Sequence, residues 1–190
     1  MKKSIYLTLL LLIATVACGW GKEPVNFRLF TSGLFANPED KSVYCVVEMK
    51  GKTDQTIFDD LMMNALCAFV QPTDVVSYVN GKMINVRYHI SDIPFSDENG
   101  TLQKGETYCT IRFWIRDGKV KVAAPHLEEI IYYSGSGSIG VRKKISPYEL
   151  ALLYSKTGDN NVSKLENPIN YTINCILGIL GGGNPYYDKW

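Results

Sequence analysis

The chain has 190 residues, of which 46% are hydrophobic, 21% charged and 12% aromatic. This composition excludes a disordered or fibrous protein and fits one globular domain, or a domain with an appendage. The 20 basic and 19 acidic residues give a formal net charge of +1, so there is no overall positive field to hold a nucleic acid. We therefore expect no nucleic-acid partner, and the composition alone does not identify a ligand.

The N-terminus has the pattern of a bacterial secretory signal. Lys2 and Lys3 precede an apolar run over residues 5–16, and small residues follow. This run is shorter than the roughly 20 apolar residues that a membrane-spanning helix needs. We predict a signal peptide over residues 1–17 and an exported protein, located in the periplasm, in the outer membrane as a lipoprotein, or outside the cell.

The cleavage site decides how the mature protein is anchored. Residues 15–18 read Thr-Val-Ala-Cys and resemble the lipobox of bacterial lipoproteins, in which the cysteine becomes the acylated first residue. Cys18 is therefore a candidate lipidation site, and a lipid there would be the only contact with a membrane. Cleavage after Gly21 by ordinary signal peptidase stays open, because Gly19 and Gly21 supply the small residues which that enzyme needs.

The remaining cysteines are expected to be mostly buried thiols, because they lie within apolar strand and helix patterns. A disulfide among them stays open, with three pairings available. The chain has no C-x-x-C motif and no second histidine at a zinc-ligand spacing, so we predict no metal site and no cofactor. The cysteines are Cys45, Cys67, Cys109 and Cys175.

A strand followed by a helix opens the predicted domain, which spans residues 22–130. Apolar and polar residues alternate over residues 42–49, as in a half-buried strand. Apolar residues then recur at helical spacing over residues 53–70, and Gln71-Pro72 ends the helix.

Antiparallel strands follow the helix. Residues 74–79 form a β-rich segment that an Asn80-Gly81 turn joins to a return strand over residues 83–91. Residues 92–106 are polar and rich in turn residues, which indicates a loop or a second, irregular hairpin. Residues 107–116 alternate most clearly, and Asp117-Gly118 turns them into a partner strand over residues 119–123. The order predicts an α+β fold in which a helix packs on one face of an antiparallel sheet.

Two segments carry a family resemblance, TDQTIFDDLMMNALCAFV in the helix and YCTIRFWIRDGKVKV in the late strand pair. With the first strand and the Asn-Gly hairpin, they resemble a secreted domain of unknown function that is common in Bacteroidota and has a TATA-binding-protein-like fold. The resemblance covers about residues 43–129. It implies an envelope or secreted protein with a helix-on-sheet fold and no known activity, and the name of the fold implies no DNA binding.

The chain changes character after residue 130. Residues 134–140 read Ser-Gly-Ser-Gly-Ser-Ile-Gly and indicate a hinge or a flexible loop. The same stretch spells G-x-G-x-x-G, but it does not lead directly into a helix as a dinucleotide site requires. Ser146 and Glu149 form a capping box for a short helix. We expect residues 131–190 to be a hinge, this helix and a C-terminal helical appendage.

The candidate site emerges when the polar sides of the strands are added together. If helices cover the apolar side, the opposite side is basic and aromatic although the whole molecule is nearly neutral. An exposed Trp between two Arg is typical of protein interfaces. The predicted binding residues are Tyr44, Arg87, His89, Arg112, Trp114, Arg116 and Lys121.

We therefore expect a non-enzymatic envelope protein, with no catalytic residues, that binds a protein or glycan partner through this Arg/Trp face or serves as a structural module. An alternative is a periplasmic hydrolase with His89 as general base. In a further alternative, the face has no function: Glu48 pairs with Arg112, the appendage covers Trp114, and the other side chains are simply solvated.

Overall fold

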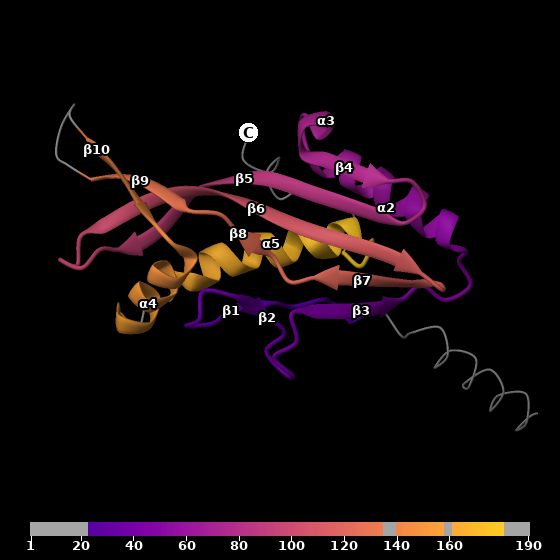
Figure 1. Ribbon diagram of the computed structural model, residues 1–190, viewed down its shortest axis with the longest axis horizontal. Helices are drawn as coiled ribbons and strands as arrows, with labels where there is room; N and C mark the ends of the chain where they lie inside the picture. The colour runs from indigo at the N-terminus through magenta and orange to yellow at the C-terminus, as the bar shows by residue number, and fades with distance from the viewer. Residues whose placement is uncertain (1–22, 135–139, 158–160, 181–190) are drawn as a thin grey trace, which may run out of the picture.

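The structure, a computed structural model, describes residues 23–134, 140–157 and 161–180. It is an antiparallel sheet with helices packed against one side (Figure 1). The strands are β1 Arg28–Leu29, β2 Phe35–Ala36, β3 Tyr44–Glu48, β4 Val76–Val79, β5 Met83–Ser96, β6 Leu102–Arg116, β7 Lys119–Ala123, β8 His126–Leu127, β9 Ile130–Ser134 and β10 Val141–Ile145. The helices are α2 Asp54–Ala68, α3 Pro72–Val75, α4 Pro147–Thr157 and α5 Val162–Ile176. The predicted α+β class is confirmed.

Strand β6 is the centre of the main sheet. The strands follow the order β10-β9-β6-β5-β4, while β7 and β8 also pair with β6 and β3 pairs with β7. All these pairings are antiparallel. The sheet therefore widens around β6, with β9 and β10 at one end and β7 and β3 at the other (Figure 1). A small separate sheet joins β1 to β2.

The core lies between the sheet and the helices. Alternate residues of β5 and β6 are fully or nearly fully buried, because successive side chains of a strand point to opposite faces. Helices α2, α4 and α5 all contribute to the same core. Buried core residues from the sheet include Ile84, Val86, Tyr88, Ile90, Cys109, Ile111, Phe113 and Ile115. This assignment of the inner face agrees with the predicted one.

Helix α2 begins where it was predicted to begin and fixes the neighbouring hairpin. The Thr53 side chain accepts a hydrogen bond from the Thr56 backbone N–H at 3.2 Å, as an N-cap does. The Asp54 carboxylate accepts the backbone N–H groups of Asp117 at 3.2 Å and Gly118 at 2.8 Å. These two residues turn β6 into β7 with positive φ angles of 54° and 69°, so the hairpin turn is tied to the helix.

Residues 92–106 form the second, irregular hairpin rather than a loop. Strand β5 continues to Ser96 and β6 begins at Leu102, with an irregularity in the register between Ile90 and Ile93. The Asp97 carboxylate accepts the N–H groups of Asn99 and Thr101, each at 3.0 Å, and closes the turn. The polar composition of this segment reflects exposure on one side and does not break the strands.

The region after residue 130 differs from the expected hinge. Strands β9 and β10 pair from Ile130↔Ile145 to Ser134↔Val141, and β9 also pairs with β6. Residues 135–139 lie outside the described residues, but Val141 begins a strand and not the helix that a dinucleotide site needs. The sequence pattern did not predict this hairpin, because β10 is exposed along most of its length and has no apolar alternation.

The last described helix packs into the core, so it is more than an appendage. Ile169, Ile173 and Ile176 of α5 are fully buried. The side chains of Glu166, Asn170 and Asn174 accept the backbone N–H groups of Leu29, Phe27 and Val25, each at 2.8 Å. Four helical residues rise about 6 Å, close to the length of two extended residues. The helix therefore holds the N-terminal segment through a regular ladder.

Helix α4 begins with the predicted capping box. The backbone N–H of Ser146 donates to Glu149 Oε2 at 2.6 Å, and the N–H of Glu149 donates to Ser146 Oγ at 3.2 Å. The helix is anchored to the sheet by Tyr154, whose hydroxyl donates to the Pro94 carbonyl at 2.9 Å.

No disulfide joins the four cysteines of the described residues. Burial raises the pKa of Cys109 to about 12 and also raises the pKa values of Cys45 and Cys175. The expectation of burial is wrong for Cys67, which is exposed. Its position in α2 falls beside the apolar stripe rather than within it.

The predicted signal peptide, including Cys18, lies outside the described residues. Within the part of the chain that the structure does describe, none of the helices combines the length and apolar character needed to cross a membrane.

Candidate binding face

All seven predicted binding residues are exposed on the side of the sheet opposite the helices, which we call the open face. The sequence thus located the face, but the structure divides it into regions with different interactions. The exposed residues are Tyr44, Arg87, His89, Arg112, Trp114, Arg116 and Lys121.

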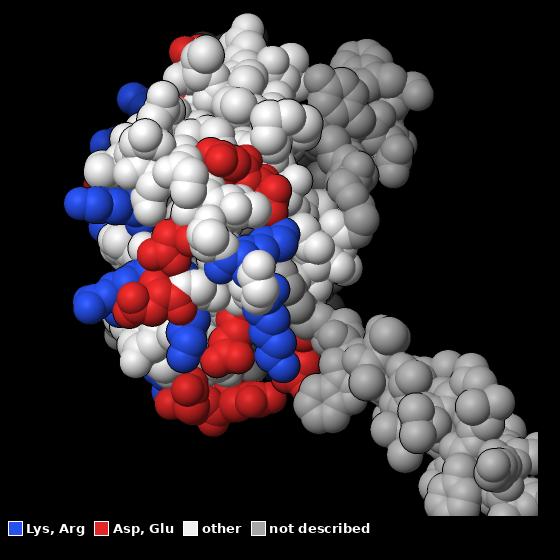
Figure 2. Space-filling model, turned by 90° about the vertical axis from the view of Figure 1, so that its right-hand side faces the viewer, with Lys and Arg blue, Asp and Glu red and all other residues white. Residues whose placement is uncertain are grey.

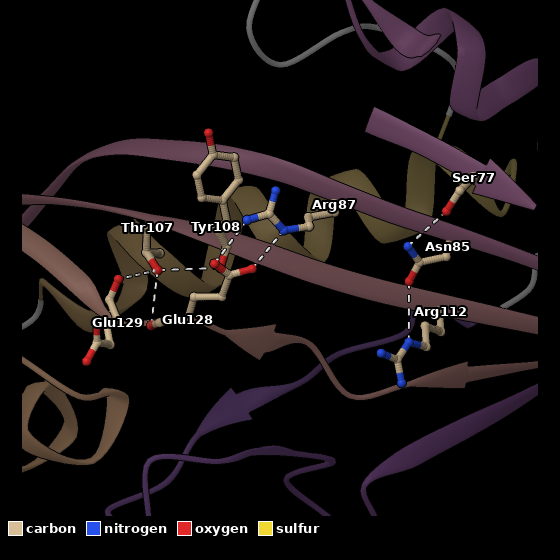
Figure 3. Close-up of polar contacts among 8 residues, drawn as sticks. All are labelled: Ser77, Asn85, Arg87, Thr107, Tyr108, Arg112, Glu128 and Glu129. Carbon is tan, nitrogen blue, oxygen red and sulfur yellow. Dashed lines mark hydrogen bonds and ion pairs between the residues drawn. The ribbon is translucent and has the colours of Figure 1, made fainter. Parts of the chain in front are cut away.

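One region is a network of charged pairs that we call the ionic cluster, formed by Arg87, His89, Glu106, Tyr108 and Glu128. The Arg87 guanidinium donates two hydrogen bonds to the Glu128 carboxylate, at 2.7 and 3.0 Å. It also lies 3.9 Å from the centre of the Tyr108 ring, as Figure 3 illustrates. Figure 3 also shows Thr107, which is buried beside the cluster and donates to the Glu128 and Glu129 carbonyls, both at 3.1 Å. The charge of Arg87 is therefore already neutralised within the protein.

The electrostatics of the Arg87–Glu128 pair agree with its geometry. The hydrogen bonds from Arg87 hold the pKa of Glu128 below its usual value. The same hydrogen bonds raise the pKa of Arg87. Bidentate pairs of this kind are geometrically specific, so Arg87 is held in place and is less available to a partner. The sequence did not indicate Glu128 as its partner, because it lies in the irregular segment between β8 and β9.

His89, the candidate general base, belongs to the same ionic cluster. Its Nε2 atom lies 3.3 Å from Glu106 Oε2, and its ring is tilted against Tyr108 with the ring centres 5.4 Å apart. Both the His89 and the Glu106 side chains are exposed by more than two fifths, at 44% and 45%. The pair thus lies on open surface, where water screens electrostatic interactions.

The second region is a cation–aromatic patch, formed by Tyr44, Arg112, Trp114 and Lys121. The Lys121 ammonium lies 4.2 Å from the centre of the Tyr44 ring and 5.8 Å from that of the Trp114 ring. Trp114 remains 36% exposed, and the C-terminal helix α5 packs on the other side of the sheet. The expectation that the C-terminal part covers Trp114 therefore does not hold for the described residues.

No carboxylate of a described residue neutralises the cations of this patch. Arg112 donates to the Asn85 side-chain oxygen at 3.3 Å, and Asn85 donates to the Ser77 hydroxyl at 3.2 Å, as Figure 3 shows. Neither Arg112 nor Lys121 forms an ion pair with a described residue. The expected Glu48–Arg112 pair is wrong, because the register places Glu48 opposite Lys119, whose ammonium lies 3.4 Å away.

A row of apolar side chains crosses the patch. The registers align Val79 with Met83, Met83 with Trp114, Trp114 with Lys121, and Lys121 with Val46. Val46 is 53% exposed and Val79 is 49% exposed. The sequence did not predict this row, because it depends on how five strands align and not on the pattern of any one strand.

The outer end of the β6–β7 hairpin carries paired charges again. Arg116 lies 3.2 Å from Asp117, and both side chains are almost fully exposed. Figure 2 looks at this end of the molecule and shows basic and acidic side chains interspersed. Arg116 is therefore placed at the rim of the open face and is separate from the Trp114 patch.

Metal chemistry has no support in the part of the chain that can be described. No group of three or more His, Cys, Asp or Glu side chains is placed there to hold a metal ion.

Comparison with known proteins finds similarity at the level of structure only. No family model matches the sequence, and no curated protein matches it. One similar solved structure is a TBP-like protein from Parabacteroides distasonis, with 13% identity and a TM-score of 0.45 over 70% of this chain and 90% of that chain. Another is a DUF4468 family protein from Bacteroides ovatus, with 13% identity and a TM-score of 0.45 over 88% of this chain and 95% of that chain. Both descriptions agree with the resemblance noted in the sequence.

Proposed function

We propose that this protein is a non-enzymatic binding module of the bacterial envelope, exported by its signal peptide and either lipid-anchored through Cys18 or soluble. Its cation–aromatic patch binds a partner protein with an acidic surface. The observation that carries the proposal is the combination of an exposed Trp114 with two neighbouring cations, Arg112 and Lys121, that have no carboxylate partner in the described part of the chain.

The chemistry of the patch favours a protein over a glycan. Trp and Arg are the residues that most often dominate the binding energy of protein interfaces. The apolar row through Val46, Val79 and Met83 supplies a surface that loses water on binding. Arg112 and Lys121 would then pair with carboxylates of the partner, which selects an acidic surface.

The test compares three immobilised forms of the protein: the wild type, Trp114→Ala and Arg87→Gln. Each is exposed to a periplasmic and outer-membrane protein extract of the producing bacterium, and the affinity of every retained protein is then measured after purification. We expect a partner with an acidic surface whose affinity falls at least about 30-fold with Trp114→Ala, since such a residue contributes about 2 kcal/mol or more. Arg87→Gln should bind like the wild type.

Two results would contradict the proposal. One is a partner that binds Trp114→Ala as well as it binds the wild type. The other is a retained acidic polysaccharide in place of a protein, which would assign the patch to a glycan. The alternative of a hydrolase rests on the His89–Glu106 pair at 3.3 Å; a hydrolytic activity that His89→Gln abolishes would favour it over the binding module.

A further inference from the structure

A second surface lies along the free edge of strand β3 and shares Tyr44 and Val46 with the margin of the cation–aromatic patch. This strand pairs with β7 on one side only. The N–H of Ala124 donates to the Val43 carbonyl and the N–H of Met49 donates to the Gly118 carbonyl, both at 2.9 Å. Backbone groups of an antiparallel strand alternate in direction, so those of Tyr44, Val46 and Glu48 point away from β7.

The edge of β3 has few of the features by which proteins protect free strands. Protective features are charged side chains, above all lysine, as well as prolines, bulges, very short strands and covering segments, and of the charged residues β3 has one, Glu48 at its end. Strand β3 reads Tyr-Cys-Val-Val-Glu and pairs with β7 without a register shift, and Val46 on it is 53% exposed. By contrast, β10 at another edge of the sheet carries Arg142, Lys143 and Lys144. The difference indicates that β10 is protected from pairing, whereas β3 is open to it.

A groove lies beside this edge. Its volume is about 440 Å³, and it is bounded by residues 23–26, by the loop between β2 and β3, and by β3 itself. The Tyr44 carbonyl already accepts the Ser42 hydroxyl at 2.7 Å. The backbone groups of Val46 and Glu48 that point away from β7 have no hydrogen-bond partner among the residues that the structure describes, so they remain for a strand that enters the groove.

The groove is acidic. Glu23, Glu39 and Asp40 line it, and no Lys or Arg is among the described residues of its wall. Neither Glu23 nor Glu39 forms an ion pair with a described residue. The loop between β2 and β3 lies below the sheet in Figure 1. Figure 2 shows acidic side chains along the lower edge of the molecule.

We propose that β3 is a docking edge that binds an extended, basic segment of another protein by strand addition. Backbone hydrogen bonds to Val46 and Glu48 give the affinity, as in other peptide sites at sheet edges. Lysine or arginine side chains of the segment pair with the carboxylates of the groove, and small apolar side chains lie beside Tyr44 and Val46. A segment of about five to seven residues matches the five residues of β3. This inference does not depend on the function proposed for the Trp114 patch.

The test uses a fluorescein-labelled heptapeptide, Lys-Val-Lys-Thr-Lys-Val-Lys, and measures its binding by fluorescence polarisation. Two peptides are compared with it: one with every lysine replaced by glutamate, and one N-methylated at alternate residues so that one edge cannot donate hydrogen bonds. We expect the basic peptide to bind, the acidic peptide not to bind, and N-methylation to weaken binding about tenfold or more.

Protein variants locate the site. Val46→Pro removes the N–H that faces the free edge without breaking a pair with β7, so it should weaken peptide binding about tenfold, while Val46→Thr should not. Glu39→Gln combined with Glu23→Gln should weaken binding at low salt. Trp114→Ala should leave peptide binding unchanged, which separates this site from the patch.

Three outcomes would overturn the proposal. The first is the absence of binding by the basic peptide. The second is equal binding of the N-methylated peptide, which would mean charge attraction without strand addition. The third is unchanged binding by Val46→Pro in a variant with the thermal stability of the wild type. If Val46→Pro does not fold, the N-methylated peptide still decides between strand addition and simple charge attraction.

Discussion

The two faces of the main sheet use polar side chains in different ways. On the covered face, Asn174 is buried at 3% exposure and makes hydrogen bonds of 2.8 Å both to and from the backbone of Val25. On the open face, Arg112 and Lys121 keep their charges without a carboxylate partner among the described residues. The buried Asn174 side chain is thus hydrogen-bonded within the fold, whereas the cations around Trp114 have no carboxylate partner among the described residues. This difference is the reason for proposing the patch as a surface for binding.

The open face contains the same contrast on a smaller scale. Arg87 is held by Glu128 and Tyr108, while Arg112 contacts only a neutral amide. Both arginines point to solvent from neighbouring central strands, so their sequence patterns look alike. The two arginines differ because Glu128, which lies outside β5 and β6, pairs with Arg87 and not with Arg112.

The largest expected effect on stability comes from Asn174→Ala. The substitution leaves the N–H and C=O of Val25 buried without partners, and each such group costs about 1 to 3 kcal/mol. We expect the free energy of unfolding to fall by about 3 kcal/mol in urea titrations. Asn85→Ala on the open face is the matched control and should change it by less than about 0.5 kcal/mol. Equal effects of the two substitutions would remove the contrast between the faces.

A smaller effect is expected from exchanging the two arginines for glutamine one at a time. Arg112→Gln should weaken binding of the acidic partner about tenfold, because it removes an unpaired cation next to Trp114. Arg87→Gln should change the affinity by less than about twofold, because Glu128 already takes up its charge. Binding measured by calorimetry at two salt concentrations tests both expectations. A larger loss with Arg87→Gln would move the site to the ionic cluster.

The smallest effect concerns the acid sensitivity of helix α4. The hydrogen bond from the Ser146 N–H lowers the pKa of Glu149 below its ordinary value of 4.5. The native state therefore binds this proton less readily than the unfolded state does. The ionised Glu149 side chain therefore stabilises the folded protein above pH 4.5. This contribution is lost as the pH falls through the lowered pKa of Glu149.

Melting temperatures at several pH values check this sign. Glu149→Gln should melt below the wild type at pH 7, and the difference should shrink towards pH 3 because the wild-type carboxylate is then protonated. A constant difference across this range would contradict the assigned role of the Glu149 charge.

Local patterns predicted those parts of the molecule that depend on neighbouring residues. Alternation over residues 107–116 correctly placed Cys109 and Phe113 inside and Trp114 outside, and the Asp117-Gly118 turn fixed the hairpin register. The capping box of α4 was also predicted, since a Ser and a Glu three residues apart suffice to define it.

Features that depend on distant segments were not predictable in this way. The buried isoleucines of helix α5 follow from its own apolar pattern. Its polar side chains, however, bind the backbone of residues 25–29, more than 130 positions away, and the local sequence does not indicate these partners. Likewise, Glu128 became the partner of Arg87 through a contact that spans 41 positions. The sequence therefore located the open face, while the division of that face into paired and unpaired cations required the structure.

If Trp114 serves binding and not folding, the free energy of unfolding should change little in the Trp114→Ala variant. Urea titration of this variant beside the wild type needs no knowledge of the partner. Because the Trp114 side chain is 36% exposed on an open sheet face, we expect the free energy of unfolding to fall by less than about 1 kcal/mol. A loss of about 3 kcal/mol or more, as expected for a Trp that fills a core, would contradict it.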